Sequence, residues 1–395
     1  MPSQRQLFFE YLGIPSSRPL GLEISSARGI YLYGPDGKEY IDLVSGVAVS
    51  NLGHQHPEII RAVKDQVDRH MHLMVYGELI QSPQVQLAEA LAGVLPPQLH
   101  STFFITSGSE AIEGAMKLAK RFTGRTEVIA FRDAYHGGTQ GALSLAGSEA
   151  LKNSFRPLIP DIRFLDFNNF ENLSSISCKT ACVVAETIQA EAGIVLPEEG
   201  FLESLRKRCT ETGALLVIDD IQMGMGRTGK MFSFEHAGII PDILCLAKAF
   251  GGGMPLGAFI SSKEIMSSLT HDPELGHITT FGGHPVSCAA ALASLNYLTS
   301  KKIYETAENK AGIFIERLSG HPSINTIRHI GLMLGIDLNS SESVHKLIPV
   351  FLNNGLIADS FLFRPKAFRI APPLIITEEE IHQTCDKIII CLDQL

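Results

Sequence analysis

The chain has 395 residues, 45% of them hydrophobic and 19% charged, which is the balance of a globular protein large enough for two domains. The net charge of −9 and the lack of a long basic tract argue against nucleic acid as a partner. No apolar run approaches the roughly 18 residues of a membrane span, and the first residues lack a signal segment, so we expect no membrane partner and a cytoplasmic location.

The first predicted element is a β-hairpin over residues 29–42, because alternating side chains flank the turn at Pro35, Asp36 and Gly37. From about residue 50, short apolar runs alternate with helical patterns such as 110–122 and 203–212. Seven runs are candidate strands: 102–106, 127–131, 162–167, 181–186, 214–219, 242–247 and 258–261. Most of them are continuous apolar runs, which is typical of strands buried on both faces. This alternation predicts an α/β fold with a mostly parallel seven-stranded sheet, whose ligand lies beyond the carboxyl ends of the strands.

The C-terminal segment predicts a smaller α+β domain. It contains helical patterns at 286–298 and 310–318, two strands within 327–338, and a last helix opened by the capping box of Thr377 and Glu380. We therefore expect a large domain over residues 50–285 and a small domain formed by residues 1–49 and 286–395.

The first candidate site follows the run 102–106, where Ser107, Gly108 and Ser109 begin a helix. Free backbone amides and two hydroxyls at a helix N-terminus suit a phosphate group. The spacing of Ser107 and Glu110 also fits a capping box, so an ordinary helix start is the alternative.

A second candidate is the acidic pair Asp219 and Asp220, which ends another apolar run shortly before Gln222. A carboxylate at the end of a buried strand needs a cation or a ligand, because burying it unpaired is costly. Neighbouring side chains point in opposite directions, so one acid can serve structure and the other chemistry. Salt bridges and magnesium sites use the same arrangement.

Lys248 ends the apolar run 242–247 and precedes three consecutive glycines. Burial lowers the pKa of a lysine and leaves a neutral amine that can attack a carbonyl carbon. Tyr135 and His136 lie in a glycine-containing loop after the run 127–131. There an aromatic ring can stack on a planar ligand or simply pack on the core.

A phosphate cradle, an aromatic side chain, a buried acid and a buried lysine together describe a pocket for pyridoxal phosphate. The sequence resembles the class III aminotransferases, fold-type-I enzymes that include the acetylornithine, ornithine and 4-aminobutyrate aminotransferases. The resemblance extends from residue 51 to the C-terminus, and its most specific motif is LAKAFGGGMPLG at 246–257. It places His54 and His56 in a family loop motif, so we expect no metal site there. The cofactor-binding residues that it implies are Ser107, Gly108, Ser109, Tyr135, His136, Asp219, Gln222, Lys248 and Thr280.

The resemblance also implies individual roles. Lys248 would carry the cofactor, Asp219 would pair with its pyridine nitrogen, and Thr280 would reach the phosphate across the interface of a homodimer. Glu191 and Arg369 would form a gate in which Arg369 holds the substrate carboxylate; a structural salt bridge is the alternative.

The expected reaction moves an amino group from an ω-amino donor, of the ornithine, N-acetylornithine or 4-aminobutyrate type, to 2-oxoglutarate by a ping-pong mechanism. Gly138 departs from the resemblance, because acetylornithine-type and ornithine-type enzymes usually have an arginine there. Arg364 is a candidate replacement because it lies near Arg369 in the sequence. The alternatives are a racemase, aminomutase or decarboxylase on the same cofactor, or a non-catalytic protein that binds it.

Overall fold

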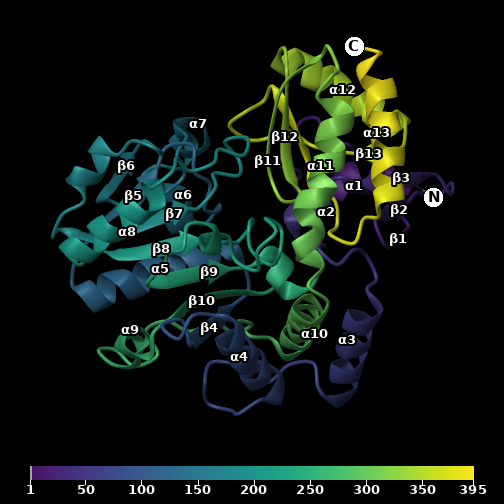
Figure 1. Cartoon of the computed structure of the whole chain (residues 1–395). Helices are drawn as coiled ribbons and strands as arrows, with labels where there is room; N and C mark the ends of the chain where they lie inside the picture. The colour runs from purple at the N-terminus through teal and green to yellow at the C-terminus, as the bar shows by residue number, and fades with distance from the viewer. Residues whose placement is uncertain (1) are drawn as a thin grey trace.

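The computed structural model describes residues 2–395 and is built around a seven-stranded sheet (Figure 1). The strand order is β4-β10-β9-β8-β7-β5-β6. The strands are β4 (Ser101–Ile105), β5 (Glu127–Phe131), β6 (Ile162–Leu165), β7 (Thr180–Glu186), β8 (Leu215–Asp219), β9 (Ile243–Leu246) and β10 (Gly257–Ser261). Each overlaps one of the seven predicted runs, and only β10 is antiparallel to its neighbours. The predicted mostly parallel sheet is confirmed.

Alternate residues of a central strand belong to two different hydrophobic clusters. In β8, Leu216 and Ile218 pack in a cluster with α8 (Phe201–Thr212), whereas Leu215 and Val217 pack in a cluster with α5 (Gly108–Thr123). Since successive side chains of a strand point to opposite faces, helices cover both faces of this sheet. The continuous apolar runs in the sequence follow from this double burial.

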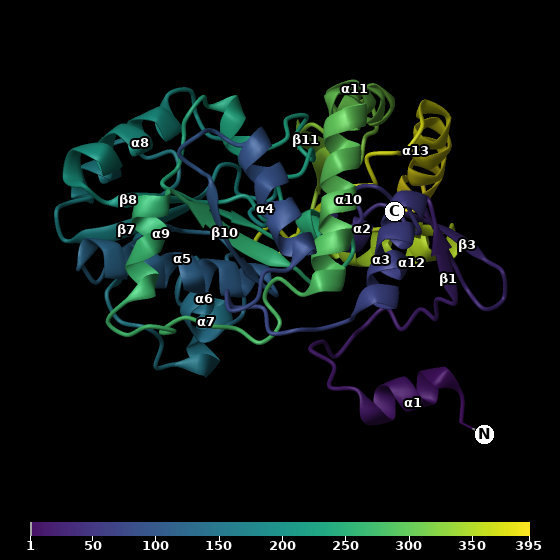
Figure 2. The ribbon, with the colours of Figure 1, turned by 90° about the horizontal axis from the view of Figure 1, so that it is seen from below.

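The remaining helices surround the sheets. They are α1 (Gln4–Tyr11), α2 (Ser45–Ala48), α3 (Pro57–Arg69), α4 (Ser82–Val94), α6 (Gln140–Ser144), α7 (Glu149–Lys152), α9 (Lys263–Ser267), α10 (Pro285–Lys301), α11 (Ala307–Leu318), α12 (Ser341–Asn353) and α13 (Glu378–Leu392). The short 3-10 helices are η1 (Asn153–Phe155), η2 (Glu171–Ser175), η3 (Ser233–His236), η4 (Lys248–Gly251), η5 (Ser268–Thr270) and η6 (Ile303–Thr306). Helix α1 lies at the margin of the molecule and buries none of its residues (Figure 2). No helix within residues 2–395 has the length and apolar character needed to cross a membrane.

Two smaller sheets lie beside the large one. One, in the order β1-β2-β3-β13, joins β1 (Ser26–Arg28), β2 (Tyr31–Tyr33), β3 (Glu39–Asp42) and β13 (Leu356–Ile357). The other, β11-β12-β14, contains β11 (Ile324–Ile330), β12 (Met333–Leu338) and β14 (Ala367–Ile370). The predicted hairpin is confirmed as β2 and β3. The parallel pairing of β3 with β13 joins the N-terminal segment to the C-terminal segment. This pairing supports the small domain that we propose from both termini, whose boundaries stay a prediction.

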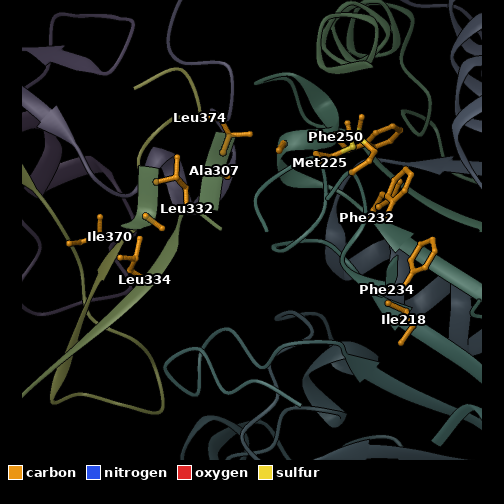
Figure 3. Close-up of a cluster of buried hydrophobic side chains, with 14 of the residues drawn as sticks. Ile218, Met225, Phe232, Phe234, Phe250, Ala307, Leu332, Leu334, Ile370 and Leu374 are labelled. Carbon is orange, nitrogen blue, oxygen red and sulfur yellow. The ribbon is translucent and has the colours of Figure 1, made fainter. Parts of the chain in front are cut away.

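One hydrophobic cluster links the large sheet to the C-terminal strands (Figure 3). Its members include Ile218 of β8 and Phe250 of η4, and also Leu334 of β12 and Ile370 of β14. Polar contacts reinforce the same junction, because the buried Arg227 donates to the carbonyls of Leu332 and Pro372 at 2.9 and 2.6 Å.

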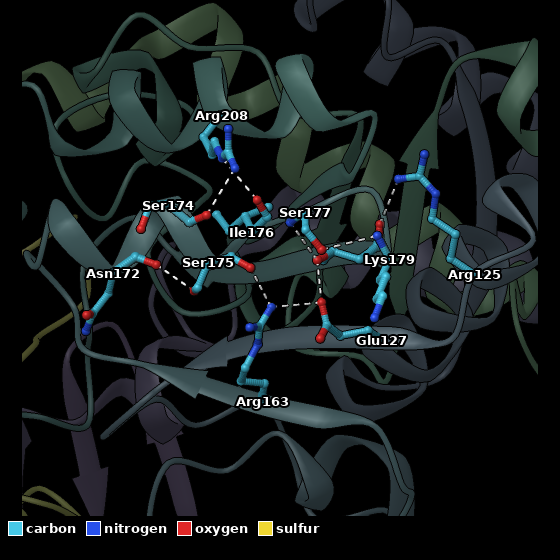
Figure 4. Close-up of polar contacts among 11 residues, drawn as sticks. Arg125, Glu127, Arg163, Asn172, Ser174, Ser175, Ile176, Ser177, Lys179 and Arg208 are labelled. Atoms are coloured by element: carbon cyan, nitrogen blue, oxygen red, sulfur yellow. Dashed lines mark hydrogen bonds and ion pairs between the residues drawn. The ribbon is translucent and has the colours of Figure 1, made fainter.

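Charged side chains tie the outer strands to the segment before β7 (Figure 4). Arg163 of β6 donates to Glu127 of β5 at 2.9 Å and to the carbonyl of Ser175 at 2.7 Å. Arg208 of α8 donates to the carbonyls of Ser174 and Ile176, both at 3.0 Å. These contacts lie away from the carboxyl ends of the strands, where the candidate site is.

Candidate active site

A cavity of about 400 Å³ lies at the carboxyl ends of β4, β7, β8 and β9. This is the edge of the sheet where the sequence predicted a ligand. Eight predicted residues line the cavity: Ser107, Gly108, Ser109, Tyr135, His136, Asp219, Gln222 and Lys248.

The N-terminus of α5 forms one wall. The hydroxyl of Ser107 caps the helix by accepting from the backbone N of Glu110 at 3.3 Å. The reciprocal half of the predicted capping box is wrong, because the Glu110 carboxylate accepts from the N and Oγ1 of Thr106 instead, at 2.7 and 2.6 Å. The first amides of a helix have no partner inside it, so those of Gly108 and Ser109 are available to an anion.

The loop that carries Tyr135 and His136 lies directly against this helix. Gly137 has a φ of 134°, and a Cβ at this position would lie only 2.0 Å from Ser109 Oγ. The backbone N of Gly138 donates to the same hydroxyl at 3.0 Å. Only glycine allows this approach, and the Ser109 O–H is left free to donate elsewhere.

Asp219 and Asp220 point in opposite directions. Asp219 Oδ2 accepts from His136 Nδ1 at 2.7 Å, and both side chains are buried. Burial by itself lowers the pKa of His136, but the hydrogen bond and charge of Asp219, together with the charge of Glu186, raise it overall. Asp220 Oδ2 instead accepts from the backbone N of Ser233 at 3.0 Å, away from the cavity. Asp219 is therefore the acid placed for chemistry.

Lys248 opens η4 directly after β9, with a φ of 51°. Its Nζ donates to Gln222 Oε1 at 3.2 Å, and Gln222 Nε2 donates to Glu191 Oε1 at 3.4 Å. Burial lowers the pKa of Lys248, although the carboxylates of Glu191 and Asp219 act in the opposite direction. A lowered pKa favours the neutral amine, which is the nucleophilic and basic form.

Glu191 and Arg369 form a buried ion pair, with exposed fractions of 5% and 1%. Arg369 Nη2 lies 2.9 Å from Oε1 and 3.1 Å from Oε2 of Glu191. Arg369 Nη1 has no hydrogen-bond partner among the described residues. Gln222 connects this pair to Lys248, so the pair lies beside the reactive amine.

Two predicted residues lie elsewhere. Thr280 is exposed and outside the cavity of its own chain, so its predicted role needs a second chain and stays a prediction. Arg364 does not point to the cavity, because its Nε and Nη2 donate to the carboxylate of Asp337 at 2.5 to 3.0 Å. The suggestion that Arg364 replaces an arginine at Gly138 is therefore not supported by its contacts.

Glu186 was missed by the sequence analysis. It ends β7, lines the cavity, and accepts from the backbone N of Tyr135 and of Ala190 at 3.3 and 3.2 Å. Burial raises its pKa to about 8. An acid at the end of a fully apolar strand is the same signal that identified Asp219, and it was present in the sequence.

Comparison with known proteins decides the family. The family described as "Aminotransferase class-III" matches residues 14–392. The chain belongs to the class III aminotransferases. It is therefore a pyridoxal-phosphate-dependent transaminase of fold type I, as the sequence predicted.

Its relatives carry several different names. An acetylornithine aminotransferase from Methanopyrus kandleri is 39% identical over 360 residues, which cover 90% of each chain. An ornithine aminotransferase from Toxoplasma gondii ME49 has a TM-score of 0.91 at 26% identity, covering 100% of this chain and 96% of its own. An adenosylmethionine-8-amino-7-oxononanoate aminotransferase from Methanocaldococcus jannaschii has a TM-score of 0.91 at 28% identity, covering 99% and 98%. This aminotransferase resembles all three, so similarity alone does not select its amino donor.

The cavity of this aminotransferase fits pyridoxal phosphate. His136 Nε2 is buried without a hydrogen-bond partner among the described residues, which is costly unless a ligand supplies one. The amides of Gly108 and Ser109 can hold the phosphate, Lys248 offers the amine, and Asp219 offers a carboxylate for the ring nitrogen.

Proposed function

We propose that this aminotransferase moves an amino group from an ω-amino compound, of the ornithine, N-acetylornithine or 4-aminobutyrate type, to 2-oxoglutarate in two successive half-reactions. The observation that carries the proposal is the buried Glu191–Arg369 pair beside Lys248. An ω-amino donor has no carboxylate on its reacting carbon, whereas 2-oxoglutarate has one. A single cavity serves both if Glu191 neutralises Arg369 for the donor and releases it for the acceptor.

Pyridoxal phosphate, when bound, supplies the carbonyl that accepts the amino group and an electron-poor ring that stabilises negative charge on the adjoining carbon. Within each half-reaction, Lys248 Nζ would act first as a general base and then as a general acid. It would move a proton from the donor carbon to the former carbonyl carbon of the cofactor, and in the opposite direction when the oxo acid is aminated. Burial lowers the pKa of Lys248, which favours the neutral amine needed for a general base. The carboxyl group of Asp219, fixed by His136, would pair with the ring nitrogen of the bound cofactor.

The resemblance implies that an arginine at the position of Gly138 would hold a carboxylate of the donor, and this chain has no arginine there. A Cβ at Gly138 would touch nothing within 4 Å, so this position leaves open space where related enzymes carry a long cation. The donor is therefore held by other groups than the usual arginine, and its identity has to be found by direct comparison of candidates.

The test is the visible absorbance of the purified holoenzyme during single additions of ornithine, N-acetylornithine and 4-aminobutyrate, without any oxo acid. We expect one donor to abolish the cofactor band and 2-oxoglutarate to restore it. A band that none of these amines discharges would contradict the proposal and favour racemase, aminomutase or decarboxylase chemistry, which needs no oxo acid.

A further inference from the structure

Glu191 lies on a tight turn, which we define as residues 189–195 and call the Glu191 turn. The turn closes where the backbones of Gln189 and Val195 exchange two hydrogen bonds, with N–O distances of 3.0 and 3.1 Å. Gly193, at its tip, has a φ of 90°. The turn rests on one face of the sheet β11-β12-β14, and this contact decides where the Glu191 carboxylate lies.

Two arginines on that face flank a glycine. Arg328 of β11 stands opposite Gly335 of β12, which stands opposite Arg369 of β14. Directly opposed residues share a face of a sheet, so the three form a row. A Cβ at Gly335 would lie 3.1 Å from the carbonyl oxygen of Gly193. The missing side chain therefore makes room for the Glu191 turn between the two arginines.

Each arginine holds a different part of the turn. Arg369 binds the Glu191 side chain, whereas Arg328 Nε donates to the backbone carbonyl of Gly193 at 2.5 Å. Arg328 is itself fixed, because its Nη2 donates to Asp337 Oδ1 at 2.5 Å. Arg364 donates to both oxygens of Asp337 and packs over Gly193, where a Cβ would lie 2.3 Å from its Cδ.

The centre of this cluster is a charged Asp337. Its side chain is almost completely buried, and burial opposes ionisation, but the hydrogen bonds from Arg364 and Arg328 lower its pKa to about 2. Asp337 is therefore ionised at neutral pH. None of its three members touches the Glu191 side chain, so this cluster holds the turn only through the backbone at Gly193. The segment before Arg364 holds Glu191 itself, because the backbone N of Leu362 and of Phe363 donate to its Oε2 and its carbonyl at 3.1 and 3.0 Å.

We propose that Arg328, Asp337 and Arg364 are positioning residues that hold the Glu191 turn against the sheet and so set how readily Arg369 exchanges Glu191 for the carboxylate of a 2-oxo acid. The proposal rests on the exchange of partners at Arg369 in the proposed function. With the backbone held at Gly193, the Glu191 carboxylate stays next to Arg369 and competes with an incoming carboxylate. Without the anchor, the turn lifts and the competition weakens.

The test is calorimetric binding of glutarate, a dicarboxylate that cannot react, to the holoenzyme. Arg328→Met keeps the apolar stem but removes both hydrogen bonds, and Arg328→Lys restores one donor. We expect Arg328→Met to bind glutarate about three- to tenfold more tightly than wild type, and Arg328→Lys to lie between them.

In a Glu191→Gln background, Arg328→Met should have no further effect, because the competing side chain at position 191 is already neutral. Arg317→Met breaks a more exposed ion pair, with Asp386 on α13, and should bind as wild type does.

An equal effect of Arg328→Met in both backgrounds, or no effect in a folded variant, would overturn the positioning role. If Arg328→Met does not fold, Gly335→Ala replaces it, since its Cβ pushes on the Gly193 carbonyl and should also tighten glutarate binding. Glutarate binding does not depend on turnover. If the enzyme fails to transaminate, the proposed function is refuted, but the binding measurement still decides whether the cluster positions the Glu191 turn. A holoenzyme that binds no glutarate in any variant would overturn the exchange at Arg369 itself.

Discussion

The chemistry of the site depends on single side chains whose burial changes their charge. Lys248 has its Nζ next to Gln222, and burial lowers its pKa, so the amine is available as a nucleophile and base. Replacing Lys248 with alanine should lower kcat by about a thousandfold or more and remove the band of the covalently held cofactor. Turnover with 2-oxoglutarate and circular dichroism measure activity and fold. Lys301→Ala, at an exposed position ending α10, is the control, and undiminished turnover of Lys248→Ala would refute the assignment.

Asp220 gives a pH dependence of stability. Burial raises its pKa to about 7, whereas an unfolded aspartate releases its proton near pH ~3.9. The folded chain therefore holds an extra proton between about pH 4 and pH 7, and its stability falls as the pH rises through this window. Asp220→Asn removes the titration, so its unfolding temperature should fall by a few degrees less than that of wild type between about pH 5 and pH 7.5.

Thermal unfolding of the holoenzyme across this pH range measures the difference. Asp68→Asn is a suitable control because Asp68 is exposed on α3, so its curve should follow that of wild type. Parallel curves for wild type and Asp220→Asn would show that Asp220 does not titrate in this window.

At the scale of elements, the packing of the loop 135–138 on α5 shapes the phosphate cradle. Gly137→Ala introduces a Cβ at 2.0 Å from Ser109 Oγ on backbone with a φ of 134°, so the loop and the helix must separate. We expect the affinity for pyridoxal phosphate to fall about tenfold or more, as measured by titration of the cofactor-free chain. The neighbouring Gly138→Ala has free space for its Cβ and no positive φ, so it should bind the cofactor as wild type does. Equal losses in both variants would contradict the argument.

The sequence predicted those elements whose pattern is local. The inner strands of the large sheet were predictable because double burial makes them continuous apolar runs, whereas the edge strands β4 and β6 are only partly buried. Helix α13 was predictable because Thr377 and Glu380 form the complete capping box. The two-residue β13 and the short β14 were not predicted, because they are strands only through pairing with β3 and β12, far away in the chain. Helix α12 was also missed, and it contains Pro349, a residue that usually ends a helix.

The residues of the candidate site also divide into those that a local sequence pattern predicts and those that only the folded chain brings together. Lys248 and Asp219 were predictable because each ends a buried strand, and Glu186 carried that signal without being used. The partners of Arg364 and Arg328 were not predictable, since Asp337 meets them only through the register of β11 and β12 and the return of the chain before β14. Charge pairing between distant segments is a property of the folded topology and leaves no local pattern.

The whole molecule presents an apolar surface around Thr280. Ile278 and Phe281, on either side of Thr280 in the chain, are each at least half exposed. The ring of Phe281 lies 4.9 Å from that of His72, whose neighbour Met71 is exposed as well. Apolar side chains gathered in this way mark an interaction surface. They support the proposed homodimer, in which Thr280 of one chain completes the cavity of the other.

Mixed dimers test this arrangement directly. Lys248→Ala dimers should be inactive, and Thr280→Ala dimers should need about tenfold more cofactor for the same activity. In a mixed dimer, the Thr280→Ala chain still has Lys248, and the Lys248→Ala chain supplies an intact Thr280 to that active site. Each mixed dimer therefore has one complete active site. Unfolding and refolding equal amounts of the two variants together pairs the chains at random, so about half of the dimers are mixed. The sample should therefore give dimers by light scattering with about a quarter of the wild-type activity per dimer at limiting pyridoxal phosphate. Activity equal to the average of the two parents would show that Thr280 does not act across an interface, and a monomeric mass would remove the interface altogether.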